Sequence, residues 1–189
     1  MPNWTHRWDA ADDTHHWFEY DDSGVVARQA SFAAGPPDSA ALAAADRSEL
    51  DWMRAEFGDF GVQLYEATYG IPVGGTVPEG LPVTAAEFER AWREARRGRH
   101  FTRIVAGPLP VGLRLNGTVS LIPWGAGITG LFVELGLPVP GFVDMGQLPR
   151  TPELWPAVGT AGTYEVLGVR LNCEAESRSR PQARLRPVS

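Results

Sequence analysis

Hydrophobic and polar residues alternate weakly with a period of two over residues 25–32, the second half of the first patterned segment of the chain, residues 16–32. Such alternation is typical of a strand with one exposed face. The sequence Asp21-Asp22-Ser23-Gly24 divides the segment into two β-prone arms, and short polar side chains followed by glycine suit a tight turn. The pattern therefore predicts a β-hairpin over residues 16–32.

A helical pattern follows over about residues 46–69. Apolar residues between Leu50 and Phe57 recur at spacings of three and four, which places them on one face of a helix. Asp46 or Ser48 can accept hydrogen bonds from the free amides at the helix start. We therefore expect helix over this range, in two successive stretches.

The segments on either side of this helix are expected to be irregular. Residues 33–45 contain Gly35-Pro36-Pro37 and a run of alanines, which indicates a linker or the start of a poorly packed helix. Residues 71–82 are rich in proline and glycine, and we expect them to form a connecting loop.

Another helix is expected over about residues 84–97. Thr84-Ala-Ala-Glu87 is a capping box, in which the Thr84 hydroxyl and the Glu87 carboxylate satisfy free amides. The apolar residues from Phe88 to Ala95 then fall on one face. Basic residues surround the end of the helix: Arg93, Arg96, Arg97, Arg99, His100 and Arg103. We interpret them as a solvated helix end, with a phosphate-contacting patch as the alternative.

Beyond Pro110 the pattern changes to short β-rich runs separated by glycines, which is typical of a small closed barrel. No helix is expected in this part. Strands are expected at about residues 113–122, 131–135, 141–145, 163–171 and 182–186. Leu185 should point inward on the last strand, which leaves Arg184 and Arg186 on the outer face.

The order of short motifs in this part resembles a known family. Gly117-Thr-Val-Ser-Leu-Ile-Pro-Trp-Gly125, Phe132-Val-Glu-Leu-Gly136 and Gly141-Phe-Val-Asp144 are followed by Val158-Gly159, Glu165-Val-Leu167 and Arg184-Leu-Arg186. This series is similar to the S1-type RNA-binding domain, an OB-fold. The resemblance implies a five-stranded S1-like OB-fold β-barrel over residues 103–189. Together with the β-hairpin and helices that the patterns predict over residues 1–102, it gives an expected fold class of α+β.

The resemblance also implies a nucleic-acid site. S1-type domains stack bases on aromatic side chains of the second and third strands, while basic groups contact phosphates. Trp124 and Phe132 fall at the aromatic positions, and Arg114, Arg184 and Arg186 are the candidates for phosphate contacts.

The sequence departs from the family pattern at two points. Asp144 stands where the family usually has histidine, and a carboxylate repels phosphate and cannot stack on a base. The loop at residues 126–130 is expanded, which separates Trp124 from Phe132 and can carry Trp124 off the stacking surface.

The charge of the chain changes this picture only in part. The net charge of −6 opposes binding to nucleic acid. However, residues 1–102 carry nine arginines against 17 acidic residues, a net charge of −8, whereas residues 103–189 carry eight against six, a net charge of +2. All basic residues are arginine, which indicates either selection for guanidinium groups or a GC-rich coding genome.

No pattern of catalytic or metal-binding residues stands out. The four histidines lack the spacing of a zinc site, and the aspartate groups lack the glycine and final glutamate of an EF-hand. Cys173 is alone and is interpreted as a small buried or half-buried thiol. We therefore expect no enzyme activity, no cofactor and no metal. No run of apolar residues is long enough to span a membrane or to form a signal peptide, so a cytoplasmic location is expected.

Three functions remain open from the sequence. The first is weak binding of single-stranded RNA on the barrel, and the second is a protein-interaction or scaffolding module whose barrel has lost RNA binding. The third is an acidic, aromatic-rich α/β module over residues 1–102 that covers the barrel and mimics nucleic-acid charge. Trp4, Trp8 and Trp17 in this module are interpreted as packing residues rather than a ligand cage.

Overall fold

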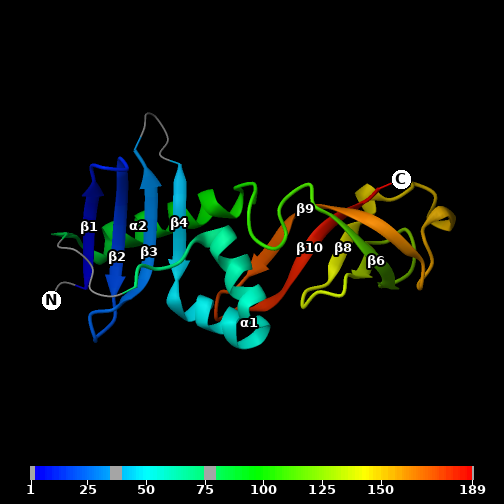
Figure 1. Ribbon diagram of the computed structural model, residues 1–189, viewed down its shortest axis with the longest axis horizontal. Helices are drawn as coiled ribbons and strands as arrows, with labels where there is room; N and C mark the ends of the chain where they lie inside the picture. The colour runs from blue at the N-terminus through cyan, green and yellow to red at the C-terminus, as the bar shows by residue number, and fades with distance from the viewer. Residues whose placement is uncertain (1–2, 35–39, 75–79, 189) are drawn as a thin grey trace. The chain divides into compact units, whose positions relative to one another are not determined.

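The computed structural model describes residues 3–34, 40–74 and 80–188, and the chain divides into two compact units, Met1–Thr102 and Arg103–Ser189 (Figure 1). The protein is α+β, with two α-helices and two sheets of five strands in this part of the chain. Each sheet belongs to one unit, and each unit is described by itself below.

The first unit contains an antiparallel sheet with the strand order β4-β3-β2-β1-β5. Its strands are β1 (Trp4–Asp9), β2 (Thr14–Tyr20), β3 (Val26–Ala33), β4 (Ala41–Asp46) and β5 (Leu81–Pro82). The hairpin predicted over residues 16–32 is confirmed as β2 and β3. Asp21 holds its turn, because its Oδ1 atom accepts hydrogen bonds from the backbone amides of Ser23 and Val25 at 2.9 and 3.0 Å.

The prediction of a linker or helix start over residues 33–45 was wrong for its last part, which forms strand β4. The alanines pair with β3 and are buried there, with Ala44 and Ala45 fully covered. Their small size allows close approach of backbone, since a Cβ on Gly70 would lie 2.9 Å from Ala43 Cβ. Residues 35–39 lie outside the described residues.

The loop predicted over residues 71–82 ends in a short strand, since Leu81 and Pro82 of β5 pair with β1. Residues 75–79 of that prediction lie outside the described residues. Strand β1 itself has no counterpart among the predicted elements. Its partner β2 lies across a turn, and Trp4 faces Glu19 while Asp9 faces Thr14.

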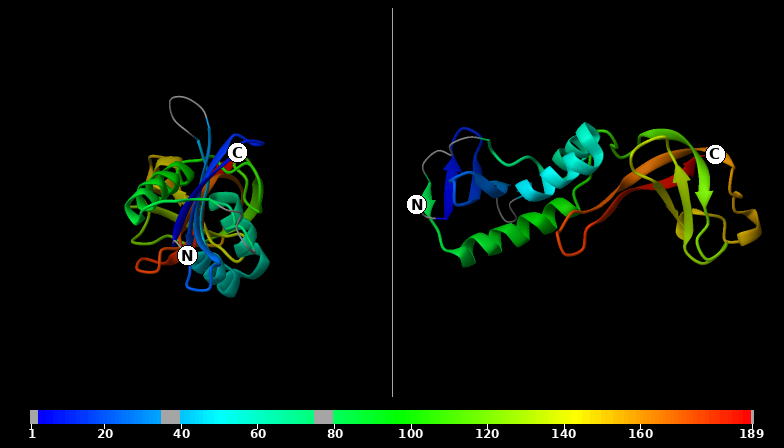
Figure 2. Two further views of the ribbon diagram at one scale, coloured as in Figure 1. Left: turned by 90° about the vertical axis from the view of Figure 1, so that its left-hand side faces the viewer. Right: turned by 90° about the horizontal axis from the view of Figure 1, so that it is seen from below.

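Two helices complete the first unit. Helix α1 (Arg47–Tyr69) begins after Asp46, whose side chain accepts hydrogen bonds from Ser48 and Glu49, and it is interrupted at Gly58, where φ is 57°. The two predicted helical stretches are thus confirmed. Helix α2 (Ala85–His100) has the predicted capping box of Thr84 and Glu87, and it extends to His100 rather than residue 97. Figures 1 and 2 show α2 running along one face of the sheet.

The second unit is a closed ring of strands in the order β10-β8-β7-β6-β9. They are β6 (Arg114–Leu121), β7 (Gly130–Glu134), β8 (Gly141–Asp144), β9 (Ala161–Asn172) and β10 (Ser179–Val188). All five lie at the predicted places. Strands β8 and β10 are parallel, and every other pair in the ring is antiparallel.

The inside of the ring is filled by apolar side chains in alternate positions: Val119, Leu131, Val133, Val143, Val166 and Leu185. The predicted inward direction of Leu185 is confirmed, since this side chain is buried while Arg186 is exposed. The described residues of this unit contain no α-helix, as predicted, but the β8–β9 connection has two 3-10 turns at Met145–Gln147 and Pro152–Leu154.

Across the described residues, neither helix is both long enough and apolar enough to cross a lipid bilayer.

Candidate nucleic-acid interface

A row of side chains crosses four neighbouring strands on the outer surface of the second unit. Leu121 of β6 faces Phe132 of β7, Phe132 faces Phe142 of β8, and Phe142 faces Arg184 of β10. Because side chains alternate between the two faces of a strand, the neighbours Leu131 and Val143 point into the core instead. The row therefore combines apolar, aromatic and cationic groups on one face.

Phe132 and Phe142 form the centre of this row. Their ring centroids are 5.1 Å apart and their planes are inclined by 60°, within the range of favourable aromatic pairs. Gly130 provides space for the pair, since a Cβ at that position would lie 2.9 Å from Phe142 Cζ. Both rings remain partly exposed, so a planar ligand can contact them.

Arg184 lies beside the aromatic pair and is held there by Asp144. The guanidinium carbon is 5.2 Å from the centroid of the Phe142 ring, and Nη2 is 3.1 Å from Asp144 Oδ2. The other carboxylate oxygen of Asp144 accepts a hydrogen bond from the Gly146 amide at 3.0 Å, which fixes the aspartate at the start of a 3-10 turn. Thus the Asp144 carboxylate neutralises the charge of Arg184.

Arg114 and Arg186 lie on the same ring of strands but in a different row. Both are paired in register with Glu165 of β9, and Arg186 Nη2 is 2.7 Å from Glu165 Oε1. Arg114 and Arg186 are exposed. Two of the three arginines predicted to contact phosphate therefore lie next to Glu165 and not next to the aromatic pair.

Trp124 lies in the loop between β6 and β7, apart from the aromatic pair. Its side chain is 78% exposed and its φ is +55°, an uncommon conformation for a residue other than glycine. In the described part of the chain no ring contact joins Trp124 to Phe132 or Phe142. The structure therefore brings Phe132 and Arg184 close to each other, with Phe142 between them, but leaves Trp124 in a loop.

The loop that carries Trp124 packs against the β8–β9 connection. The amide of Met145 donates to the Thr129 carbonyl at 3.0 Å, and a Cβ on Gly127 would lie 2.8 Å from Pro152 Cγ. Large apolar side chains are exposed on these two connections and on the adjoining end of β6: Leu121, Trp124, Ile128, Met145, Leu154 and Val158. This apolar end is a second candidate contact surface of the unit.

A shallow hollow of about 710 Å³ lies over β6, β7 and β9. Its lining includes Asn116 and Thr163, which share a hydrogen bond of 3.1 Å, and its one charged lining residue is Glu134. Because a carboxylate repels phosphate, this hollow suits a nucleic-acid backbone less well than the Arg184 side of the aromatic pair.

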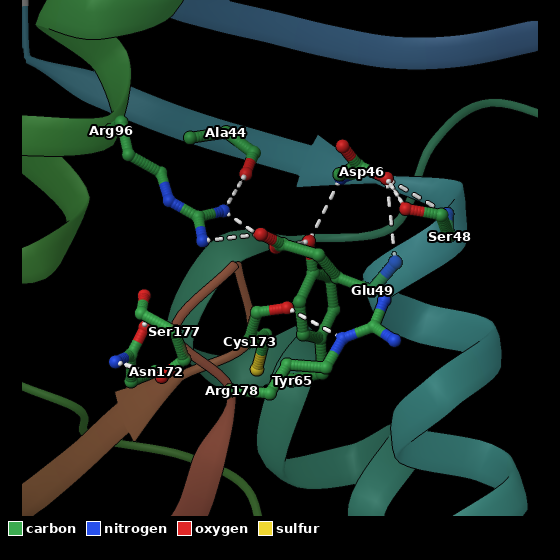
Figure 3. Close-up of polar contacts among 10 residues, drawn as sticks. All are labelled: Ala44, Asp46, Ser48, Glu49, Tyr65, Arg96, Asn172, Cys173, Ser177 and Arg178. Atoms are coloured by element: carbon green, nitrogen blue, oxygen red, sulfur yellow. Dashed lines mark hydrogen bonds and ion pairs between the residues drawn. The ribbon is translucent and has the colours of Figure 1, made fainter. Parts of the chain in front are cut away.

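The β9–β10 connection is ordered by its own polar contacts. Asn172 Nδ2 donates to the Ser177 carbonyl at 2.7 Å, and Arg178 Nε donates to the Cys173 carbonyl at 3.1 Å (Figure 3). Cys173 is buried, as predicted.

Arginines at the end of α2 have structural partners in the first unit, so their interpretation as a solvated helix end was wrong for two of them. Arg96 makes a bidentate ion pair with the buried Glu49, with both N–O distances at 2.7 Å (Figure 3). Arg99 donates to the carbonyls of Ala67 and Thr68 in the last turn of α1, at 2.8 and 2.7 Å.

Tyr65 completes the buried cluster around Glu49. Its hydroxyl donates to Glu49 Oε2 at 2.8 Å and accepts from the Asp46 amide at 2.8 Å (Figure 3). Burial raises the pKa of Tyr65, and the charge of Glu49 raises it further. Burial alone would lower the pKa of Arg96, but its hydrogen bonds and charge interaction with Glu49 raise it. The cluster is therefore a fixed set of charges that ties β4, α1 and α2 together.

Histidine and tryptophan side chains gather on one face of β1 and β2. His6 Nε2 and His15 Nδ1 are 3.0 Å apart, and Trp17 stands 4.4 Å from His6 between ring centroids. Trp8, which is 55% exposed, is stacked near His15. Among the described residues, no group of three or more His, Cys, Asp or Glu side chains could hold a metal ion.

Compared with models of known protein families, the chain matches none, and no curated protein matches its sequence. Support for a nucleic-acid interface therefore comes from the geometry of the second unit alone.

Phe142 is the residue of this interface that the sequence reasoning missed. It lies within the predicted third strand, two positions before Asp144, and alternation places both on the same face. This alternation could have identified Phe142 as an outward-facing residue from the sequence. What the sequence did not supply is the register, which sets Phe142 directly between Phe132 and Arg184.

Proposed function

We propose that this is a non-enzymatic protein whose second unit is an S1-like OB-fold that binds single-stranded RNA weakly. The observation that carries the proposal is the Phe132–Phe142 pair on the outer face of the second and third strands, with Arg184 beside it. This is the face on which OB-folds bind oligonucleotides.

The strand connectivity supports the OB class. The first strand of the ring pairs with the second and the fourth, and the third runs parallel to the fifth. A closed Greek-key ring of five strands fits this class. The inclined aromatic pair then offers π-surfaces for bases, since every nucleobase can stack irrespective of sequence.

The charge distribution supports phosphate contacts on one side of the pair. Arg184 lies against Phe142, and Arg186 follows it two residues later on β10. Arg114 lies on β6, in register with Glu165. In this proposal Arg184 contacts the phosphate nearest the stacked bases, while Arg114 and Arg186 contact more distant phosphates.

The test is fluorescence anisotropy with labelled single-stranded RNA and DNA at two salt concentrations. We expect salt-sensitive binding, and Phe132→Leu and Phe142→Leu should each weaken it by roughly 1–3 kcal/mol, the range found for one base–aromatic stack. Arg184→Gln should weaken binding and reduce the salt slope by roughly 0.7, the value for one phosphate contact on a single strand.

Phe101→Leu is the matched control, because Phe101 is an exposed phenylalanine of the first unit, 82% accessible. It should leave the affinity unchanged. If the wild-type protein binds neither RNA nor DNA at low salt, the proposal fails.

A second candidate function, protein recognition, is favoured by the exposed apolar end around Trp124. The variant Trp124→Ala separates the two uses of this residue in the same titration. A loss of RNA affinity would assign Trp124 to base stacking, as the sequence predicts. Unchanged RNA affinity, with Phe142→Leu still impaired, would exclude Trp124 from base stacking and so favour protein recognition at the apolar end.

A further inference from the structure

We infer that Asp144 regulates the proposed RNA site by occupying Arg184 in the free protein, and that an incoming phosphodiester takes the place of the Asp144 carboxylate. The inference rests on the proposed function, because it concerns the same face. It assigns a role to Asp144, whose negative charge opposes nucleic-acid binding.

In the free protein Arg184 contacts both the Phe142 ring and the Asp144 carboxylate, and a bound nucleic acid would have to replace these contacts. Its guanidinium group lies over the Phe142 ring at 5.2 Å, and its Nη2 atom is 3.1 Å from Asp144 Oδ2. A base that stacks on Phe142 from this side must move the guanidinium or stack on it. A phosphate that approaches Nη2 competes with the Asp144 carboxylate, because Nη2 is the atom that donates to Asp144 Oδ2.

The pair is weak enough to open. Both side chains are partly accessible, at 37% for Arg184 and 46% for Asp144. Exposed ion pairs contribute little net stability, since water and salt replace much of the attraction. The carboxylate also keeps its hydrogen bond from the Gly146 amide through Oδ1, so Asp144 can stay in place when Arg184 leaves.

Exchange of one anion for another explains how a carboxylate can be compatible with this site. In the free protein Asp144 prevents an unpaired cation from lying over the aromatic ring. When a phosphodiester binds, the net gain in binding free energy is that of the phosphate contact minus that of the lost Asp144–Arg184 ion pair. The affinity for RNA is thereby lowered, and ligands without a phosphate next to the stacked base gain no ion pair with Arg184.

The decisive experiment is a double-mutant cycle on RNA affinity with Asp144→Asn and Arg184→Gln. Asparagine retains the side-chain oxygen that accepts from the Gly146 amide, so the turn keeps its cap. We expect Asp144→Asn to tighten binding of a short oligouridine by about two- to fivefold when Arg184 is present. The same substitution should change the affinity little in the Arg184→Gln background.

Glu153→Gln is the charge control, since it removes one negative charge from an exposed position in the β8–β9 connection. Equal tightening by Asp144→Asn in both Arg184 backgrounds would show general repulsion and overturn the exchange. Unchanged affinity in Asp144→Asn would also overturn it. Competition by a polyglutamate peptide as strong as that by RNA would assign the site to acidic proteins instead.

A measurement on the free protein separates this inference from the proposed function. NMR of the Arg184 side chain reports the ring-current shift from Phe142, which should decrease in Asp144→Asn. An unchanged shift overturns the role of Asp144 even if RNA binds. Release of Arg184 without RNA binding by any variant overturns the proposed function and the exchange with phosphate, but retains Asp144 as the group that positions Arg184.

Discussion

At the scale of single residues, the buried Glu49–Arg96 pair shows how charge can stabilise the first unit. Both partners are largely removed from water, and each carboxylate oxygen accepts one N–H from Arg96 at 2.7 Å. Arg96 also lies 3.9 Å from the Tyr69 ring centroid. A buried pair of this kind has a modest net value, but loss of one partner leaves an uncompensated buried charge.

Arg96→Met should therefore destabilise the first unit by about 3–5 kcal/mol, because Glu49 loses its bidentate partner. Urea unfolding followed by residue-resolved NMR measures this change. Arg93→Met is the matched control, since Arg93 is an exposed arginine on the same helix, and it should change the free energy of unfolding by less than about 0.5 kcal/mol. Equal stability of the two variants would contradict a structural role for the pair.

The sequence alone did not show which arginines of α2 have structural partners and which are solvated. Arg93, Arg96, Arg97 and Arg99 crowd into the last turns of one helix, and all of them suit a helix end. Their partners Glu49, Ala67 and Thr68 are distant in sequence. Only packing of α1 against α2 decides which arginines are structural.

At the scale of secondary-structure elements, α2 is the best example of local specification. Its capping box lies within four consecutive residues, and Glu87 Oε2 accepts from the Thr84 amide at 2.8 Å while the Glu87 amide donates to Thr84 Oγ1 at 3.3 Å. The same box is visible in the sequence, because both partners are neighbours along the chain.

Thr84→Ala should lower the free energy of unfolding of the first unit by about 1 kcal/mol, since one amide at the helix start loses its acceptor. Thr84→Ser keeps the hydroxyl and should retain most of the stability. Urea titrations of both variants under identical conditions provide the comparison. A serine variant as unstable as the alanine variant would show that the hydroxyl is not what stabilises the helix start.

Elements without local signals were harder to predict. The β2–β3 hairpin and the strands of the second unit follow from alternation and turn residues. Strand β4 is mostly alanine, a residue without β preference, and it forms because β3 and the helices enclose it. In the same way, alternation predicted the outward direction of Arg184, whereas the contact of Phe142 with Phe132 and Arg184 needed the strand register.

At the scale of the whole molecule, titratable groups are unevenly divided between the two units. All four histidines lie in residues 1–102, and none lies in residues 103–189. Burial lowers the pKa of His6, and the nearby His15 and His16 lower it further. Burial also lowers the pKa of His16, with Arg7 and His15 acting in the same direction against the opposing effect of Asp9.

The first unit should therefore lose stability as the pH falls below about 6.5, the ordinary pKa of histidine in an unfolded chain. Below that pH the unfolded chain binds more protons than the folded one, so the free energy of unfolding decreases. The second unit should not respond in this range. Residue-resolved urea unfolding at pH 7.5 and 5.5 tests both statements.

His6→Asn should reduce the difference between the two pH values, because it removes one of the titrating groups. His100→Asn is the control, at a helix end away from the His6–His15 contact. A stability of the first unit that rises on acidification would contradict the lowered pKa values.

The cluster around Glu49 has one more consequence, which concerns association between molecules. Strand β4 is at the edge of its sheet, where free backbone groups can recruit a strand from another chain and begin aggregation. Here the Ala44 carbonyl accepts from Arg96 and the Asp46 amide donates to Tyr65, so side chains occupy positions that a foreign strand would use. We therefore expect the cluster that joins the two helices to the sheet to hinder pairing of a foreign strand with Ala44 and Asp46, and so to make this edge a poor template for fibrils.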